Sequence, residues 1–410
     1  MSVISFFSGI YCKEQSVVAT VHETTGLPIV PDTDLVALAA KLSGLGADKI
    51  EKAFTAKTSV FNKFTHEKQR ATAWLRLALA TRLGEDAKCI LTGFCGLLAP
   101  RELTHVLRVC LIGDAAFRRA VAIEESGLSD REAQRALERA DEDRAVWTEL
   151  VAGTKDPWSA TLHDMVVPMD KTEVDKAADL VVKHLADPAL RVTDASQAVA
   201  RDFLLAARVE AVVTGKGHDV AVSAKDGVIT LTINKKVLLL DRLETELRAI
   251  AAKVDGVRDV TTKVGKGFYQ TDIYRRADFE MPTKVLLVDD EREFVQTLSE
   301  RLSMREVGSH VVYDGESALD MMAEDEPEVM VLDLKMPGID GIEVLKRAKL
   351  ARPDVEIIIL TGHGSEADRE LCMKLGAFAY LQKPVDIELL SETLKKANEK
   401  VRLKKTADSG

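Results

Sequence analysis

The stretch Val329-Met-Val-Leu-Asp-Leu-Lys-Met-Pro-Gly338 decides the fold of the C-terminal third of this chain. Its four apolar residues, Val329–Leu332, are typical of a strand buried on both faces, and Asp333 follows them directly. A similar run, Val285–Val288, is followed directly by the pair Asp289-Asp290. Because ligands of an open parallel sheet bind at the carboxyl ends of its strands, we expect these three carboxylates to meet at one edge.

Apolar runs alternate with helical stretches throughout residues 283–402, which predicts a doubly wound α/β domain. Three further strands are predicted, at His310–Val312, Ile357–Leu360 and Ala379–Leu381. The last two strands end near a hydroxyl, Thr361, and near a cation, Lys383. Three carboxylates need a compensating charge, and Mg²⁺ suits a site with few carboxylates, waters and a phosphate. This inventory is the one that phosphoryl transfer to an aspartate requires.

This segment resembles the receiver domain of bacterial response regulators, which belong to two-component systems. The motifs that carry the resemblance are Val288-Asp-Asp290, Leu332-Asp-Leu-Lys-Met-Pro337-Gly-Ile-Asp-Gly341, Leu360-Thr-Gly362 and Lys383-Pro384. The resemblance implies a five-stranded, flavodoxin-like doubly wound sheet. It also implies that Asp333 accepts a phosphoryl group from a sensor histidine kinase or a phosphotransfer protein. The implied ligands of Mg²⁺ are Asp289, Asp290, Asp333 and the backbone carbonyl of Lys335.

The same resemblance places a switch pair at Thr361 and Tyr380 and a phosphoryl-stabilising cation at Lys383. The hydroxyl of Thr361 would move to the phosphoryl group, and Tyr380 would turn into the vacated space. The shape change is a population shift between two packed states. A plain core role for Tyr380 remains an alternative.

Residues 1–190 are predicted to form an α/β domain whose first strand precedes Gly9. A phosphate-binding loop at this point would read G-x-x-x-x-G-K-[ST]. The chain places Ser16 correctly but has Glu14-Gln15 where the second glycine and the lysine would stand, and Lys13 is the nearest cation. Glu14 would bring a negative charge among the phosphates.

Nevertheless, this segment resembles the cytidylate-kinase-like branch of the P-loop nucleoside monophosphate kinases. The stretches that carry the resemblance include Ile4-Ser-Phe-Phe-Ser-Gly9, Cys89-Ile-Leu-Thr-Gly93, Phe117-Arg-Arg119 and Ala140-Asp-Glu-Asp-Arg144. The residues implied to bind a nucleotide are Gly9, Lys13, Ser16, Arg118, Arg119, Asp141 and Arg144. The alternative for the charged helical residues is a solvated face with ion pairs between positions i and i+3. Because the phosphate loop is broken, we expect a degenerate domain that binds a nucleotide or a partner; a receiver-regulated kinase is the alternative function.

Residues 191–267 have a different order of predicted elements: helix, strand, strand, helix, strand. They resemble a BON domain through Asp226-Gly-Val-Ile-Thr-Leu231 and Val254-Asp-Gly-Val-Arg-Asp-Val260, which implies a small α+β interaction module. Residues 268–282 are polar and predict a linker, and residues 403–410 predict a flexible tail.

Composition restricts the remaining functions. The formal net charge of −10, and the lack of a basic helix-turn-helix after residue 402, argue against DNA binding. The five cysteines are predicted to be buried free thiols, no apolar run is long enough to span a bilayer, and no secretory signal is recognisable. Together these features predict a cytoplasmic protein; a homodimer and a nucleotide ligand remain open.

Overall fold

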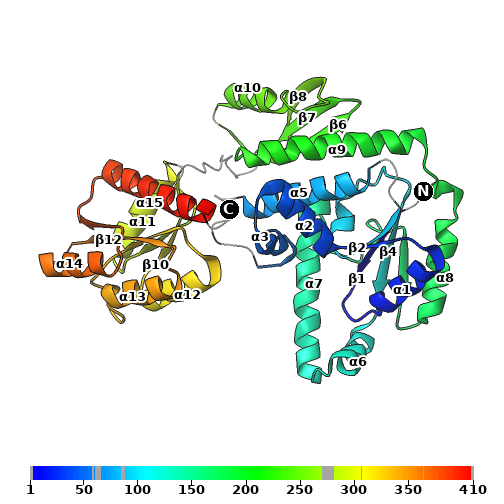
Figure 1. Ribbon diagram of the computed structural model, residues 1–410, viewed down its shortest axis with the longest axis horizontal. Helices are drawn as coiled ribbons and strands as arrows, with labels where there is room; N and C mark the ends of the chain where they lie inside the picture. Colours follow the sequence, from blue (N-terminus) through cyan, green and yellow to red (C-terminus); the bar gives the residue numbers. More distant parts are fainter. Residues whose placement is uncertain are drawn as a thin grey trace. The chain divides into compact units, whose positions relative to one another are not determined.

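The computed structural model describes residues 3–57, 60, 66–84, 88–237, 239–269, 281–305, 307–362 and 364–407 (Figure 1). The chain divides into two compact units. The N-terminal unit comprises the described residues of 3–57, 67–215 and 220–269, and the C-terminal unit consists mainly of those of 281–407. Most of the predicted linker and the end of the predicted tail lie outside the described residues.

The N-terminal unit contains a five-stranded parallel sheet in the order β2-β3-β1-β4-β5. Its strands are β1 (Val3–Ser8), β2 (Ile29–Pro31), β3 (Cys89–Thr92), β4 (Val106–Ile112) and β5 (Met165–Pro168). The central strand β1 is buried along its whole length, as expected for a continuous apolar strand of a parallel sheet. The α/β fold predicted for this segment is therefore confirmed.

Helices cover both faces of this sheet. They are α1 (Glu14–Thr25), α2 (Asp32–Ser43), α3 (Ala47–Glu51), α5 (Glu67–Arg82), α6 (Ala115–Ser126), α7 (Asp130–Ala152) and α8 (Val174–Leu185). One core joins the sheet to α2, α5 and α7 and includes Leu35, Leu75 and Trp147. The other joins it to α1 and α8 and includes Val17 and Val181.

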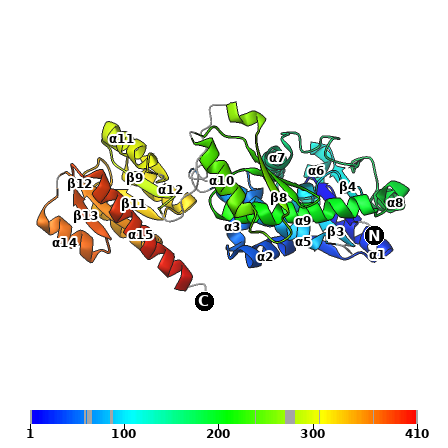
Figure 2. The same ribbon diagram turned by 90° about the horizontal axis from the view of Figure 1, so that it is seen from above.

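The segment after α8 has the predicted order of elements. It runs through α9 (Asp194–Gly215), β6 (Ala221–Lys225), β7 (Val228–Ile233), α10 (Leu240–Ala251) and β8 (Asp259–Val264). Strand β7 lies between antiparallel β6 and parallel β8, and α10 lies beside α9 (Figure 2).

Helix α9 connects this small sheet to the larger one. It packs along α5, where Glu210 pairs with Arg76, and its Phe203 and Ala207 belong to the same core as Trp147. The boundary predicted near residue 190 therefore falls inside one compact unit.

The C-terminal unit has a five-stranded parallel sheet in the order β10-β9-β11-β12-β13, which is the flavodoxin-like order. Its strands are β9 (Val285–Val288), β10 (Ser309–Val312), β11 (Val329–Leu332), β12 (Glu356–Thr361) and β13 (Ala379–Gln382). All five predicted strands are confirmed.

Helices α11 (Arg292–Ser303) and α15 (Ile387–Ala407) cover one face of this sheet. Helices α12 (Gly315–Asp325), α13 (Gly341–Ala351) and α14 (Glu366–Lys374) cover the other. The starts of the last three helices follow from local sequence, because Asp314, Asp340 and Ser365 each cap the first turn with a side-chain oxygen.

All five cysteines are free and buried, as predicted. In the described parts of the chain, no helix combines the length and apolarity that crossing a bilayer requires.

Candidate phosphoryl-acceptor site

The topology of the C-terminal unit brings the three predicted carboxylates together. Strand β9 pairs with β11 so that Val288 lies beside Leu332, and the residues that follow these two positions are acidic. One carboxylate oxygen from each of Asp289, Asp290 and Asp333 lies within 4.8 Å of the others. Asp289 and Asp333 are buried, and Asp290 is more exposed.

Backbone contacts fix the position of Asp333. Its N–H donates to the carbonyl of Val288 at 2.9 Å, and one carboxylate oxygen accepts from the N–H of Leu334 at 2.8 Å. The first turn of α13 approaches this loop so closely that a Cβ on Gly341 would lie 2.2 Å from the Asp333 carbonyl oxygen. Glycine at position 341 is therefore required by the packing of α13 against the Asp333 loop.

Lys383 extends into the acidic cluster from the end of β13. Its backbone N–H donates to the Thr361 carbonyl at 2.9 Å, which anchors the residue to the neighbouring strand. The ammonium nitrogen lies 2.7 Å from Asp289 Oδ2 and 3.5 Å from Asp333 Oδ2, and the side chain is only 10% exposed. The predicted cation is therefore at the carboxylates, but closer to Asp289 than to Asp333.

The charges of the cluster are only partly balanced. Burial raises the pKa of Asp289 even though Lys383 opposes the shift. For Lys383, burial alone would lower the pKa, but hydrogen bonds to Asp289 and Glu291 raise it above its ordinary value. One ammonium faces several carboxylates, and oxygen ligands with excess negative charge are what a hard divalent cation binds. The residues present therefore fit Mg²⁺.

Thr361 and Tyr380 both lie against Gly364. A Cβ on Gly364 would meet the Tyr380 hydroxyl at 1.6 Å and the Thr361 methyl carbon at 3.1 Å. The Tyr380 hydroxyl is buried and has no hydrogen-bond partner among the described residues. In this structure the tyrosine ring already points inward, and its ring packs with the core that underlies α12 and α13.

Two residues that contact Lys383 were not identified from the sequence. The Glu291 carboxylate lies 2.8 Å from the ammonium nitrogen, and the centre of the Phe294 ring lies 4.5 Å from it. The available signal was their place in sequence, since both follow the acid pair within one helical turn. The exposed Lys335 lies in the loop between β11 and α13, two residues after Asp333.

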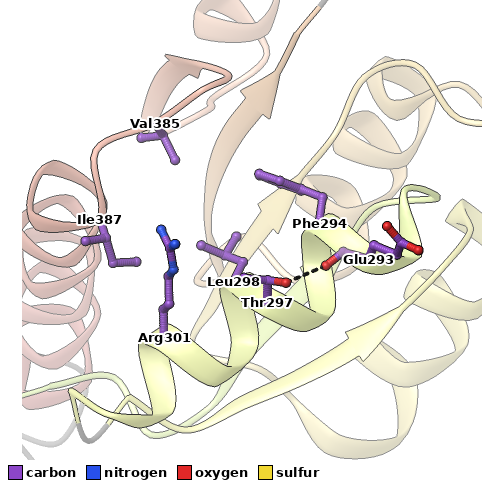
Figure 3. Close-up of a pocket in the computed structure, with 7 residues that line it drawn as sticks. All are labelled: Glu293, Phe294, Thr297, Leu298, Arg301, Val385 and Ile387. Atoms are coloured by element: carbon purple, nitrogen blue, oxygen red, sulfur yellow. Dashed lines mark hydrogen bonds between the residues drawn. The ribbon is translucent and has the colours of Figure 1, made fainter.

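A groove of about 370 Å³ begins beside this lysine (Figure 3). It is lined by Glu293, Phe294, Thr297, Leu298 and Arg301 of α11 and by Val385 and Ile387 after β13. Its floor is apolar, and Glu293 and Arg301 supply opposite charges from the same helix. The groove therefore adjoins the carboxylate cluster through Phe294.

In the N-terminal unit, two of the predicted arginines contact the loop after β1. Arg118 donates to the Ile10 carbonyl at 2.9 Å and forms two hydrogen bonds with Asp141, both at 2.8 Å. Arg144 donates to the Ser8 carbonyl at 2.7 Å. The partner of Asp141 is thus Arg118 of another helix, and the buried Arg118 does not belong to a solvated face.

Other predicted residues of this loop are arranged differently. Gly9 lies near Arg118, since an added Cβ would be 3.2 Å from its guanidinium carbon. Lys13 has a positive φ of 54° at the start of α1, Ser16 is exposed, and Arg119 pairs with Asp130 at 3.2 Å. The structure therefore brings Gly9, Arg118, Asp141 and Arg144 together and leaves Ser16 and Arg119 outside that group.

Glu14 begins α1 at this loop. Burial raises its pKa to about 7, despite a helix N-terminus that favours negative charge. The loop therefore contains a partly buried acid of this chain where the compared motif has glycine.

Comparison with known proteins identifies two segments. Residues 285–395 match the response regulator receiver domain family, and residues 3–171 match the cytidylate kinase-like family. Response regulator MprA of Mycolicibacterium vanbaalenii and that of Mycobacterium tuberculosis are each 37% identical to this chain over 110 residues, which is 27% of this chain and 48% of each regulator. The chain thus spans about half the length of these curated relatives.

Among solved structures, a receiver domain protein from Clostridium thermocellum is 33% identical, with a TM-score of 0.29, covering 29% of this chain and 97% of that one. A CheY-like receiver domain protein from Methanospirillum hungatei is 24% identical, with a TM-score of 0.29, over 29% of this chain and 96% of that one. With the acid cluster at the ends of β9 and β11, these findings identify residues 285–395 as a response regulator receiver domain, in a chain whose residues 3–171 match the cytidylate kinase-like family.

Proposed function

We propose that this protein is a two-component response regulator whose Asp333 accepts a phosphoryl group from a sensor histidine kinase or a phosphotransfer protein. The observation that carries the proposal is the convergence of Asp289, Asp290 and Asp333 within 4.8 Å, beside the Lys383 ammonium. The donor class follows from the receiver domain family that this segment matches.

The transfer is a displacement at phosphorus. A carboxylate oxygen of Asp333 attacks, the bond between phosphorus and the donor nitrogen breaks, and the donor imidazole leaves with the electron pair. Lys383 moves toward the transferred oxygens and balances their charge, and the Thr361 hydroxyl donates a hydrogen bond to one of them. Both groups stand at the ends of strands, so little reorganisation of the backbone is needed.

Asp289, Asp290, Asp333 and the backbone carbonyl of Lys335 are proposed to hold Mg²⁺, which when bound neutralises the carboxylates and the phosphoryl oxygens. Without such a cation, an incoming phosphoryl group would meet the excess negative charge of the cluster. This is the physical reason to expect phosphorylation to depend on a divalent cation.

The output of the switch is proposed to be the N-terminal unit. When Thr361 turns to the phosphoryl group, the space beside Gly364 changes, and the inward position of Tyr380 is stabilised. The change involves β12, β13 and α14, and a shift of a few kcal/mol between two packed states is enough to alter a surface.

The groove between α11 and the segment after β13 is proposed to receive the phosphodonor protein. A donor histidine must approach Asp333, so its protein must contact the surfaces that border the site. The groove offers apolar contacts from Phe294 and Leu298, with opposite charges at Glu293 and Arg301. An amphipathic helix that carries the histidine fits this pattern.

The decisive experiment is phosphorylation of the full chain by acetyl phosphate with Mg²⁺, followed on a phosphate-affinity gel. The wild type is expected to be labelled, and Asp333→Asn is expected to lose the label, because the amide is not a nucleophile. Removal of Mg²⁺ by a chelator should have the same effect as the substitution. Asp340→Asn, which changes a helix-capping acid nearby, serves as the matched control and should retain the label. Labelling of Asp333→Asn at the wild-type level would refute the proposal.

A further inference from the structure

Glu291 is placed unusually for the first residue of a helical turn. It occupies the N-cap of α11, but its side chain makes no capping hydrogen bond there. Its N–H donates to Asp289 Oδ1 at 3.0 Å, and its carboxylate, with the side chain 64% exposed, reaches the Lys383 ammonium nitrogen at 2.8 Å. The residue therefore contacts the acidic cluster through its backbone and the cation of the site through its side chain.

The distances around Lys383 show which carboxylates hold it. The ammonium nitrogen is 2.7 Å from Asp289 and 2.8 Å from Glu291, but 3.5 Å from Asp333. The Phe294 ring, 4.5 Å from the same nitrogen, is a further attraction on the α11 side. To pair with a phosphoryl group on Asp333, the ammonium must give up part of its interaction with these groups.

We propose that Glu291 is a positioning residue that holds Lys383 away from Asp333 and thereby limits how readily the phosphoryl group is accepted. This inference rests on the proposed function of Asp333. Because Glu291 is largely exposed, its ion pair is weakened by solvent, and its effect is of the size measured for surface pairs. Its removal frees Lys383 without removing any proposed ligand of the cation.

The test uses the full chain with acetyl phosphate and Mg²⁺. Glu291→Gln is expected to raise the rate of Asp333 phosphorylation by about two- to fivefold. The affinity for beryllofluoride, measured by calorimetry with Mg²⁺, should tighten by a similar factor. Glu316→Gln is the matched control, because Glu316 is an exposed acid of the first turn of α12, at the same edge of the sheet. This control should leave both quantities at the wild-type values.

A double-mutant cycle separates the role of Lys383 from simple charge repulsion. In a Lys383→Met background, Glu291→Gln should no longer change the affinity for beryllofluoride. An equal gain in that background, or no gain in the wild-type background, would overturn the inference. If the wild type takes no label, or Asp333→Asn keeps it, the proposed function itself fails, whereas a labelled wild type with an unaltered Glu291→Gln variant rejects only the role of Glu291.

Discussion

Asp289 and Glu14 are carboxyls whose pKa is raised by burial, but their surroundings differ. Asp289 has the Lys383 ammonium 2.7 Å away and two further acids beside it. Glu14 stands in the first turn of α1, where the helix dipole favours its charge, yet burial still raises its pKa to about 7. The first arrangement suits a bound cation, while the second makes the stability of the N-terminal unit depend on pH.

Glu14→Gln should stabilise the N-terminal unit at pH 8 but not at pH 4. A carboxyl with a raised pKa keeps its proton in the folded chain while the unfolded chain loses it, so stability falls as pH rises from about 4.3 to about 7. The amide avoids this loss, and we expect a gain of about 1–3 kcal/mol at pH 8. Urea unfolding followed by tryptophan fluorescence measures it, with the exposed Glu23→Gln as control. An equal gain at both pH values would contradict this explanation.

At the scale of elements, one buried acid ties three elements of the receiver domain together. Glu356 begins β12 with its side chain fully buried, and it receives Lys400 at 3.1 Å and Lys404 at 3.0 Å from α15. Lys349 of α13 lies 3.8 Å away. Burial alone would raise the pKa of Glu356, but the hydrogen bonds from the two α15 lysines, with the charge of Lys349, bring it below the ordinary value.

Glu356→Gln should therefore loosen the end of α15 at neutral pH. Breaking a buried ion pair on one side costs about 3–5 kcal/mol, and the lost contacts are those of β12 with α15. Because the pKa is lowered, this stabilisation is present above the ordinary glutamate value and is lost as pH falls through the lowered one. Amide hydrogen exchange in α15 should thus differ strongly between variant and wild type at pH 7.

The matched control for this prediction is Asp354→Asn. Asp354 lies 4.0 Å from the same Lys404 but is an exposed acid, so its removal should cost no more than about 1 kcal/mol. Equal exchange rates in wild type and Glu356→Gln would show that the lysines do not anchor α15.

At the scale of the whole molecule, each unit has its own cores and its own parallel sheet. All three tryptophans of the chain, Trp74, Trp147 and Trp158, belong to the N-terminal unit. Trp147 is fully buried among aromatic residues, including Phe54 and Phe94. Tryptophan fluorescence therefore reports on the N-terminal unit alone, whereas beryllofluoride is expected to bind only the receiver domain.

This separation gives a direct test of coupling between the units. If the receiver domain switches the N-terminal unit, Mg²⁺ with beryllofluoride should change the free energy of unfolding measured by tryptophan fluorescence, by about 1–3 kcal/mol. Asp333→Asn should show no such change. An unchanged transition in wild-type protein that demonstrably binds beryllofluoride would mean that the N-terminal unit is not the output.

The sequence by itself determined the strands of both parallel sheets and the meeting of the three acids at one edge of the receiver domain. Apolar runs of four or more residues are a local signal, and the position of a polar residue directly after a strand is inherited from it. The order of elements in residues 194–264 and the buried free cysteines were predictable for the same reason. The BON resemblance of that segment and the metal ligands stay predictions.

Only the tertiary structure decided the contacts that join distant parts of the chain. It placed Glu291 on Lys383, paired Asp141 with Arg118 instead of a neighbour on its own helix, and packed α9 into the core of the N-terminal unit. The physical reason is that hydrophobic periodicity shows that a helix face is buried, but not which surface covers it. Partners of charged side chains likewise depend on how the elements pack, because a long side chain reaches whichever opposite charge lies nearest in space.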